Sequence, residues 1–210
     1  MRRFNIKKPN RNRFRLEGLY TGHLKITYKG VPCIKCPNDY VMYQMIINEI
    51  KPDMIIEIGA NMGGSAYYMA DILDSIGHGE IHSIDIKDIV YDEAKSHSRI
   101  KFFFDGWEQY NLDLIKGDRI LVIEDSSHEY KNTLGAINRF SPVVTKGSYL
   151  IVEDGIVNDL GRSKEFDGGP LKAIKEFLPS HPEFEPDEKW LNFFGYESTF
   201  NTRGYLKKIK

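Results

Sequence analysis

The chain has 210 residues, of which 41% are hydrophobic and 28% are charged, and its formal net charge is −1. This length suits one globular domain that buries enough apolar surface to need no disulfide or metal for its stability. A net charge near zero argues against nucleic acid as a partner of the whole molecule. No apolar run approaches about 18 residues, so we expect no membrane span.

The two cysteines, Cys33 and Cys36, stand in C-x-x-C spacing. A structural zinc site needs a second such pair or paired histidines, and neither follows in the sequence. We therefore interpret both residues as ordinary thiols. So few cysteines are typical of a reducing compartment, and we expect a cytoplasmic protein.

The N-terminal residues 1–15 are strongly basic and contain no acid. They could grip RNA, a membrane surface or an anionic substrate, but a solvated arm or an arm packed on another subunit is the preferred interpretation. This arm and the supply of 12 Tyr and 12 Phe are weak indications of a homo-oligomer. We divide the chain into a basic arm with a lead-in segment, 1–37, and a single domain, 38–210.

Apolar periodicity and turn residues predict alternating helices and strands along that domain. Asn38 or Asp39 can cap the first helix. We expect helices at 38–50, from 65 onward, at 132–144 and at 168–178, and strands at 54–58, 81–86, 100–104, 119–123 and 148–152. Two extended segments, 184–194 and 199–209, would form an antiparallel pair. This order predicts an open, mostly parallel α/β sheet with helices on both faces.

A glycine turn follows the buried strand at 54–58. Its glycines would let the backbone approach a ligand at a helix N-terminus, where Ser65 can cap the helix. The spacing does not fit the dinucleotide motif G-x-G-x-x-G, and no P-loop lysine follows. Glu57 would repel a pyrophosphate but could hold an ammonium group, which favours S-adenosylmethionine over NAD. The predicted cofactor residues here are Glu57, Gly59, Asn61, Gly63, Gly64 and Ser65.

Two further positions complete the predicted cofactor site. Asp85 lies at the end of the next strand, where a carboxylate can accept hydrogen bonds from both ribose hydroxyls. Asp105 and Gly106 follow the third strand and, with Trp107, could flank an adenine.

Acidic residues end the fourth and fifth strands. Asp125, Glu153 and Asp154 would meet at one edge of the sheet and repel one another unless a cation joins them. Oxygen ligands without thiolates favour Mg²⁺, with Mn²⁺ or Ca²⁺ as alternatives. His128 lies three residues beyond Asp125, and we predict it to be the general base beside a metal-bound hydroxyl. Glu124 could be a helper or a structural residue.

Several segments together resemble the cephalosporin hydroxylase and rhamnosyl O-methyltransferase family. They are Gly30, Pro32 and Lys35 in the lead-in, then EIGANMGGSA, IEDSSHEY, YLIVEDG and a closing GYLKK. The resemblance implies a class I S-adenosylmethionine-dependent methyltransferase, with a Rossmann-like seven-stranded sheet whose last strand is antiparallel. The chain is short for this family, so insertions that form a substrate lid could be missing.

The resemblance also implies roles for individual residues. Asp125, Glu153 and Asp154 would hold a divalent metal ion, and Asp125 with His128 matches a D-x-x-H arrangement in which the histidine is the base. Glu57, Gly59 and Asp85 match cofactor positions.

We therefore expect a Mg²⁺-dependent O-methyltransferase that acts on a hydroxyl of a sugar or small-molecule metabolite, in natural-product or glycan biosynthesis. One alternative is a non-catalytic module that binds the cofactor or RNA on the same fold. An NAD-dependent oxidoreductase is disfavoured by the glycine spacing and by Glu57.

Overall fold

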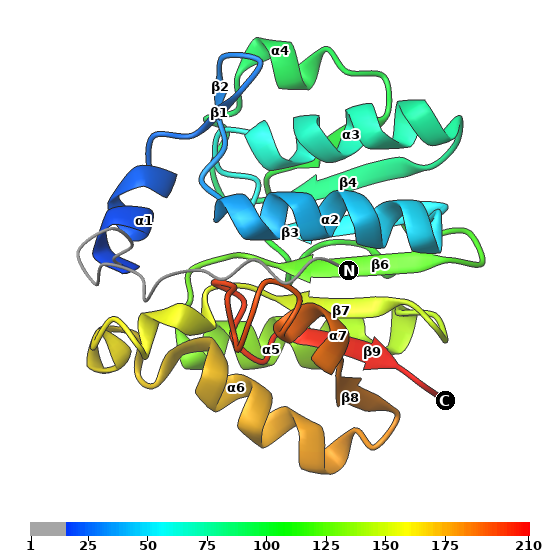
Figure 1. Cartoon of the computed structure of the whole chain (residues 1–210). Helices are drawn as coiled ribbons and strands as arrows, with labels where there is room; N and C mark the ends of the chain where they lie inside the picture. Colours follow the sequence, from blue (N-terminus) through cyan, green and yellow to red (C-terminus); the bar gives the residue numbers. More distant parts are fainter. Residues whose placement is uncertain (1–15) are drawn as a thin grey trace, which may run out of the picture.

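A computed structural model describes residues 16–210, and its main feature is one seven-stranded sheet (Figure 1). Five neighbouring strands are parallel, and the last strand in the sequence runs antiparallel to both of its neighbours. In spatial order the strands are β5 (Ile100–Phe103), β4 (Glu80–Ile84), β3 (Met54–Ile58), β6 (Ile120–Glu124), β7 (Tyr149–Val152), β9 (Tyr205–Lys208) and β8 (Phe184–Pro186). The predicted fold class is confirmed. The basic arm, 1–15, lies outside the described residues, and the division at residue 37 stays a prediction.

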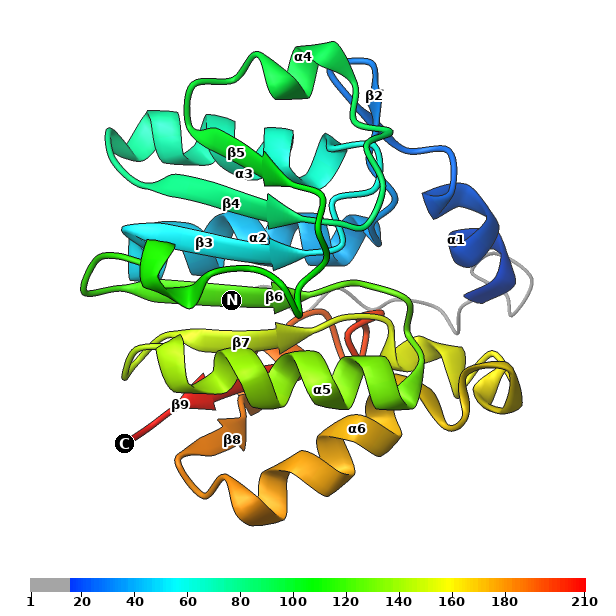
Figure 2. The same cartoon turned by 180° about the vertical axis from the view of Figure 1, so that it is seen from behind.

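Helices cover both faces of this sheet (Figures 1 and 2). The α-helices are α1 (Leu16–His23), α2 (Pro37–Ile50), α3 (Gly64–Ile76), α4 (Asp92–Lys95), α5 (Tyr130–Phe140), α6 (Gly169–Phe177) and α7 (Glu188–Leu191). A small hairpin of β1 (Thr27–Tyr28) and β2 (Val31–Pro32) joins α1 to α2. Short 3₁₀ turns lie at Leu112–Leu114, Ser141–Val143, Gly155–Val157, Ser163–Phe166 and Leu178–Ser180.

The alternation of side chains along each strand creates two core layers. Ile55 packs in a cluster with residues of α2 and α3, whereas its neighbour Ile56 packs with residues of α5 and α6. Successive strand residues point to opposite faces, so both faces need apolar side chains. This explains why the strands of the sequence are continuous apolar runs. None of the helices in residues 16–210 is long and apolar enough to span a membrane.

The predicted caps of α2 are wrong. The helix begins at Pro37, after Cys36, without a side-chain cap. Asn38 donates through Nδ2 to the carbonyl of Ser198 at 2.9 Å. Asp39 is buried and accepts hydrogen bonds from the C-terminal segment, which it ties to α2.

The predicted extended segment 184–194 is also wrong in its second half. Only Phe184–Pro186 is a strand, and Asp187 then caps the short helix α7 by accepting from the backbone N–H of Lys189 at 2.9 Å. Trp190 of α7 is buried in the core beside Tyr149. The predicted antiparallel pairing is confirmed, because β8 pairs with β9.

Candidate active site

A cavity of about 690 Å³ lies outside the carboxyl ends of β3, β4, β6 and β7, next to α1. The predicted residues that line it are Gly59, Asn61, Gly64, Ser65, Asp85, Gly106, Asp125, His128 and Asp154. Four other predicted residues, Glu57, Gly63, Asp105 and Glu153, are not among its lining residues. One cavity thus brings the glycine turn and the acidic strand ends together, as parallel strands require.

The glycine turn makes two close approaches to other segments. Gly59 has a φ of +107°, and a Cβ there would lie 1.9 Å from the carbonyl oxygen of Asp125. A Cβ at Gly64 would lie 2.2 Å from the carbonyl oxygen of Pro32. These glycines therefore let the end of β6 and the lead-in segment close around the cavity.

Ser65 does not cap α3, contrary to the prediction. Gly63 occupies the N-cap position, and the Ser65 hydroxyl instead donates to Glu57. Glu57 is fully buried behind Ser65 and also accepts from the hydroxyl of Ser83. Burial raises the pKa of Glu57, against the lowering effect of Lys35 and both serine hydroxyls. Glu57 therefore lies behind Ser65, which lines the cavity, and the contact of Glu57 with a cofactor stays a prediction.

Asp85 organises the loop after β4. Its carboxylate accepts from the backbone N–H groups of Asn61 at 2.8 Å, Ile86 at 2.7 Å and Lys87 at 3.1 Å. Trp107 lines the same end of the cavity, and its indole N–H donates to Asn132 at 3.0 Å. This end has the carboxylate and the flat aromatic surface that a nucleoside would contact.

The opposite part of the cavity holds Asp125, His128 and Asp154. Ligand atoms of these three residues all lie within 4.8 Å of one another, and His128 Nε2 is 3.3 Å from Asp154 Oδ2. Both His128 and Asp154 have positive φ values, 60° and 56°. Carboxylate oxygens are the ligands that Mg²⁺ and Mn²⁺ prefer, so Asp125 and Asp154 fit a divalent cation, with the His128 imidazole beside them.

Glu153 lies beside these residues but faces inward, to a lysine that the sequence analysis did not assign to the site. The Lys35 ammonium is paired with Glu153 and lies 3.0 Å from Asp125 Oδ2. Tyr43 of α2 donates its hydroxyl hydrogen to the same Glu153 oxygen at 2.6 Å. We call Lys35, Asp125, His128, Glu153 and Asp154 the acidic centre. In the sequence, the indication of this role was the position of Lys35 between Cys33 and Cys36, just before a helix.

Burial and mutual repulsion shape the protonation of this centre. Burial raises the pKa of Asp125 to about 6, while the Lys35 ammonium lowers it. The pKa of Glu153 rises to about 7 through burial and through Asp125, again opposed by Lys35. Burial alone would lower the pKa of His128, but Asp154 and the other carboxylates raise it above its usual value.

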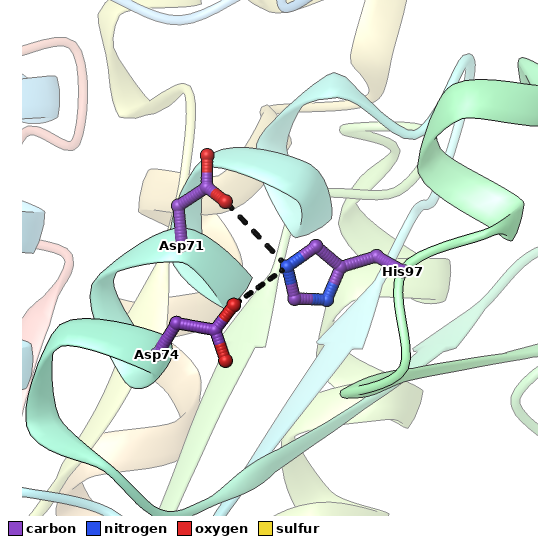
Figure 3. Close-up of side chains that lie close together, drawn as sticks. All are labelled: Asp71, Asp74 and His97. Carbon is purple, nitrogen blue, oxygen red and sulfur yellow. Dashed lines mark ion pairs between the residues drawn. The ribbon is translucent and has the colours of Figure 1, made fainter.

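A second group of potential ligands does not line the cavity (Figure 3): it joins Asp71 and Asp74 of α3 to His97 of the segment before β5. His97 Nε2 is 3.5 Å from Asp71 and 3.2 Å from Asp74. Lys29 pairs with Asp71 at 2.5 Å, and Arg99 pairs with Asp74. Because both carboxylates already have cationic partners, this group is an anchor that fastens the β1–β2 turn and the segment before β5 to α3.

Part of the cavity lining carries aromatic and cationic groups. Arg162 donates to the hydroxyl of Tyr20 at 2.6 Å, which joins α1 to the segment after β7. The guanidinium of Arg162 also lies 5.3 Å from the centre of the Phe166 ring. The ring of Phe166 is in turn 5.8 Å from that of His128. These contacts link α1 and the segment after β7 to the acidic centre.

Known proteins resemble the chain in sequence and in structure. The profile of the family described as "Rhamnosyl O-methyltransferase/CmcI" matches residues 21–106 and 107–209. The rhamnosyl O-methyltransferase of Mycobacterium leprae (strain TN) is 31% identical over 189 residues, covering 86% of this chain and 82% of that protein.

Two solved structures of CmcI share the fold. One contains SAH, with a TM-score of 0.69 and 20% identity over 88% of this chain and 83% of that one. The other contains Mg and SAM, with a TM-score of 0.69 and 19% identity over 89% of this chain and 78% of that one.

Proposed function

This chain belongs to the rhamnosyl O-methyltransferase/CmcI family of S-adenosylmethionine-dependent methyltransferases, and from that premise we propose a Mg²⁺-dependent methyl transfer to a sugar hydroxyl. The family membership favours this activity over an NAD-dependent oxidoreductase and over a non-catalytic module. The observation that carries the proposal is that one cavity is lined by the glycine turn, by Asp85 and by three members of the acidic centre, Asp125, His128 and Asp154.

S-adenosylmethionine would lie along the glycine turn in this proposal. The amides near Asn61 and Gly64 would face its amino-acid end, and Asp85 would accept from the ribose hydroxyls. Gly106 and Trp107 would flank the adenine at the far wall. Glu57, Gly63 and Asp105 do not line the cavity, and their contact with the cofactor stays a prediction.

The acidic centre would prepare the acceptor hydroxyl. Asp125 and Asp154 would hold the divalent cation, with Glu153 as the third predicted ligand, held next to them by Lys35 and Tyr43. When bound, the cation lowers the pKa of a coordinated hydroxyl. His128 Nε2 would take that proton, and the acceptor oxygen would attack the sulfonium methyl carbon in line. The bond from that carbon to sulfur would break as the new bond to oxygen forms, and S-adenosylhomocysteine would leave. Orientation and electrostatics would supply most of the rate enhancement.

A sugar hydroxyl is the favoured acceptor because the similar mycobacterial proteins are named rhamnosyl O-methyltransferases. Part of the cavity lining supports this choice. Phe166 and Tyr20 offer aromatic faces against which a sugar ring can pack, and Arg162 offers hydrogen-bond donors.

The test is methyl transfer from labelled S-adenosylmethionine to rhamnosyl glycosides, with and without Mg²⁺. We expect His128→Gln and Asp154→Asn each to lower turnover by roughly 100-fold or more, while the affinity for S-adenosylhomocysteine changes little. Asp74→Asn, in the anchor on α3, is the matched control and should keep normal turnover. Full turnover of both active-site variants in chelator would contradict the proposal.

A further inference from the structure

Lys35 is a charged side chain buried in the acidic centre. Only 3% of the residue is exposed, and its ammonium reaches Asp125 after β6 and Glu153 after β7 at the same time. The ring of Tyr43 lies 5.2 Å from this ammonium and adds a cation–π contact. A lysine is rarely buried so completely unless paired charges compensate for its lost hydration.

The lysine comes from a segment that is held on both sides. The β1–β2 turn before it is fastened to α3 by the ion pair of Lys29 with Asp71, and α2 begins two residues after it. Behind it, the carbonyl oxygen of Pro32 packs against Gly64, where no side chain could fit. The Lys35 ammonium is therefore held in a fixed position between the ends of β6 and β7, which are neighbours in the sheet.

Charge balance explains what a fixed ammonium does here. Asp125, Glu153 and Asp154 are three carboxylates at one sheet edge, and without a cation their repulsion would turn them apart or leave them protonated. One ammonium offsets one of these charges, and His128 Nε2 faces Asp154 Oδ2 at 3.3 Å; a divalent ion can balance the negative charge that remains. The carboxylates can then hold their arrangement before any ion arrives.

We propose that Lys35 is the built-in counter-ion of the acidic centre: a positioning residue that preassembles Asp125 and Glu153 in the metal-free protein. Its charge also opposes that of an incoming divalent cation, so it keeps the affinity for that ion moderate. Only this second consequence depends on the proposed metal role. The preassembly does not.

The first experiment is thermal unfolding of metal-free protein. Lys35→Met leaves the buried Glu153 and the partly buried Asp125 without their cation, and we expect the melting temperature to fall by roughly 10 °C. Lys29→Met, a lysine of the same lead-in segment that pairs with Asp71 at the surface, should lower it much less.

A double variant separates charge balance from packing. In Lys35→Met with Glu153→Gln, the ammonium and one carboxylate are removed together, and the introduced glutamine amide can still accept from Tyr43. We expect this double variant to regain at least half of the loss in melting temperature caused by Lys35→Met. Losses that simply add would overturn the proposal. If Lys35→Met alone fails to fold, the double variant decides: it should fold, whereas a packing role for the lysine requires that it fail too.

Titration with Mn²⁺ tests the second consequence. We expect Lys35→Met to bind Mn²⁺ roughly tenfold more tightly than the wild-type protein, and to gain more in melting temperature on its addition. Equal or weaker binding by the variant would overturn this consequence. No Mn²⁺ binding by the wild-type protein would instead count against the proposed metal role. The double variant would still test whether Lys35 preassembles the two carboxylates.

Discussion

At the scale of single residues, the close contact between Gly59 and Asp125 joins the glycine turn to the acidic centre. Gly59→Ala would drive a Cβ into the Asp125 carbonyl. We expect a loss of about 2–3 kcal/mol in the free energy of unfolding and weaker binding of S-adenosylhomocysteine, measured by denaturant unfolding and calorimetry. Gly30→Ala is the control, because Gly30 also has a positive φ of +89° but no atom within 4 Å of the added Cβ. Equal losses in the two variants would contradict a specific role for the contact.

Residues at strand ends could be predicted from the sequence, whereas their partners could not. Asp125, His128 and Asp154 meet because parallel strands end at one edge, which a pattern of apolar runs reveals. The inward turn of Glu153 depends on Lys35, whose approach is set by the packing of a lead-in segment with little periodicity. Hydroxyl-to-carboxylate hydrogen bonds such as that of Ser65 with Glu57 are likewise decided by tertiary structure, not by local propensity.

At the scale of elements, Asp39 fastens the start of α2 to the segment before β9. It accepts from the backbone N–H of Phe200 at 3.0 Å, from the hydroxyl of Tyr205 at 2.9 Å and from that of Thr199. Burial nevertheless raises the pKa of Asp39 to about 7, against these hydrogen bonds. The folded protein should therefore hold a proton here between about pH 4 and 7 that the unfolded chain has already released.

The stability contributed by this group should accordingly fall as pH rises from about 4 to 7, by up to about 1.4 kcal/mol per pH unit, and stay constant above that range. Asp39→Asn removes the titration, so the slope of unfolding free energy against pH should become less negative than in the wild-type protein. Denaturant unfolding at several pH values measures both slopes. Identical slopes would mean that the three donors keep Asp39 ionised.

Element positions were more predictable than element ends. The first five strands of the sheet lie within two residues of their predicted bounds, because buried strands are compact apolar runs between turns. Helix caps failed at Asp39 and Ser65, since each polar side chain bonds to a distant segment or strand instead of its own helix. The helix α7 was missed because Trp190 and Leu191 also suit a strand.

At the scale of the whole molecule, cofactor binding should stabilise the entire fold, since the cavity draws on β3, β4, β6, β7 and α1. S-adenosylhomocysteine at 100 times its dissociation constant would add about 2.7 kcal/mol, which raises the melting temperature by roughly 5–10 °C. NAD at the same concentration should leave it unchanged. A scanning-calorimetry experiment with both ligands makes the comparison, and a shift with NAD alone would contradict the assignment of the cavity.

The strand order of the sheet has a consequence for biosynthesis. β7, which leads directly into Glu153 and Asp154, has β9 as its neighbour, although β9 is made only after α6, β8 and α7. During translation β7 therefore remains an unpaired edge, open to pairing with other chains, until Tyr205–Lys208 has left the ribosome. The nascent chain can assemble the parallel strands β3 to β7 first, but the edge of the sheet beside Glu153 and Asp154 is completed only after Tyr205–Lys208 has been made.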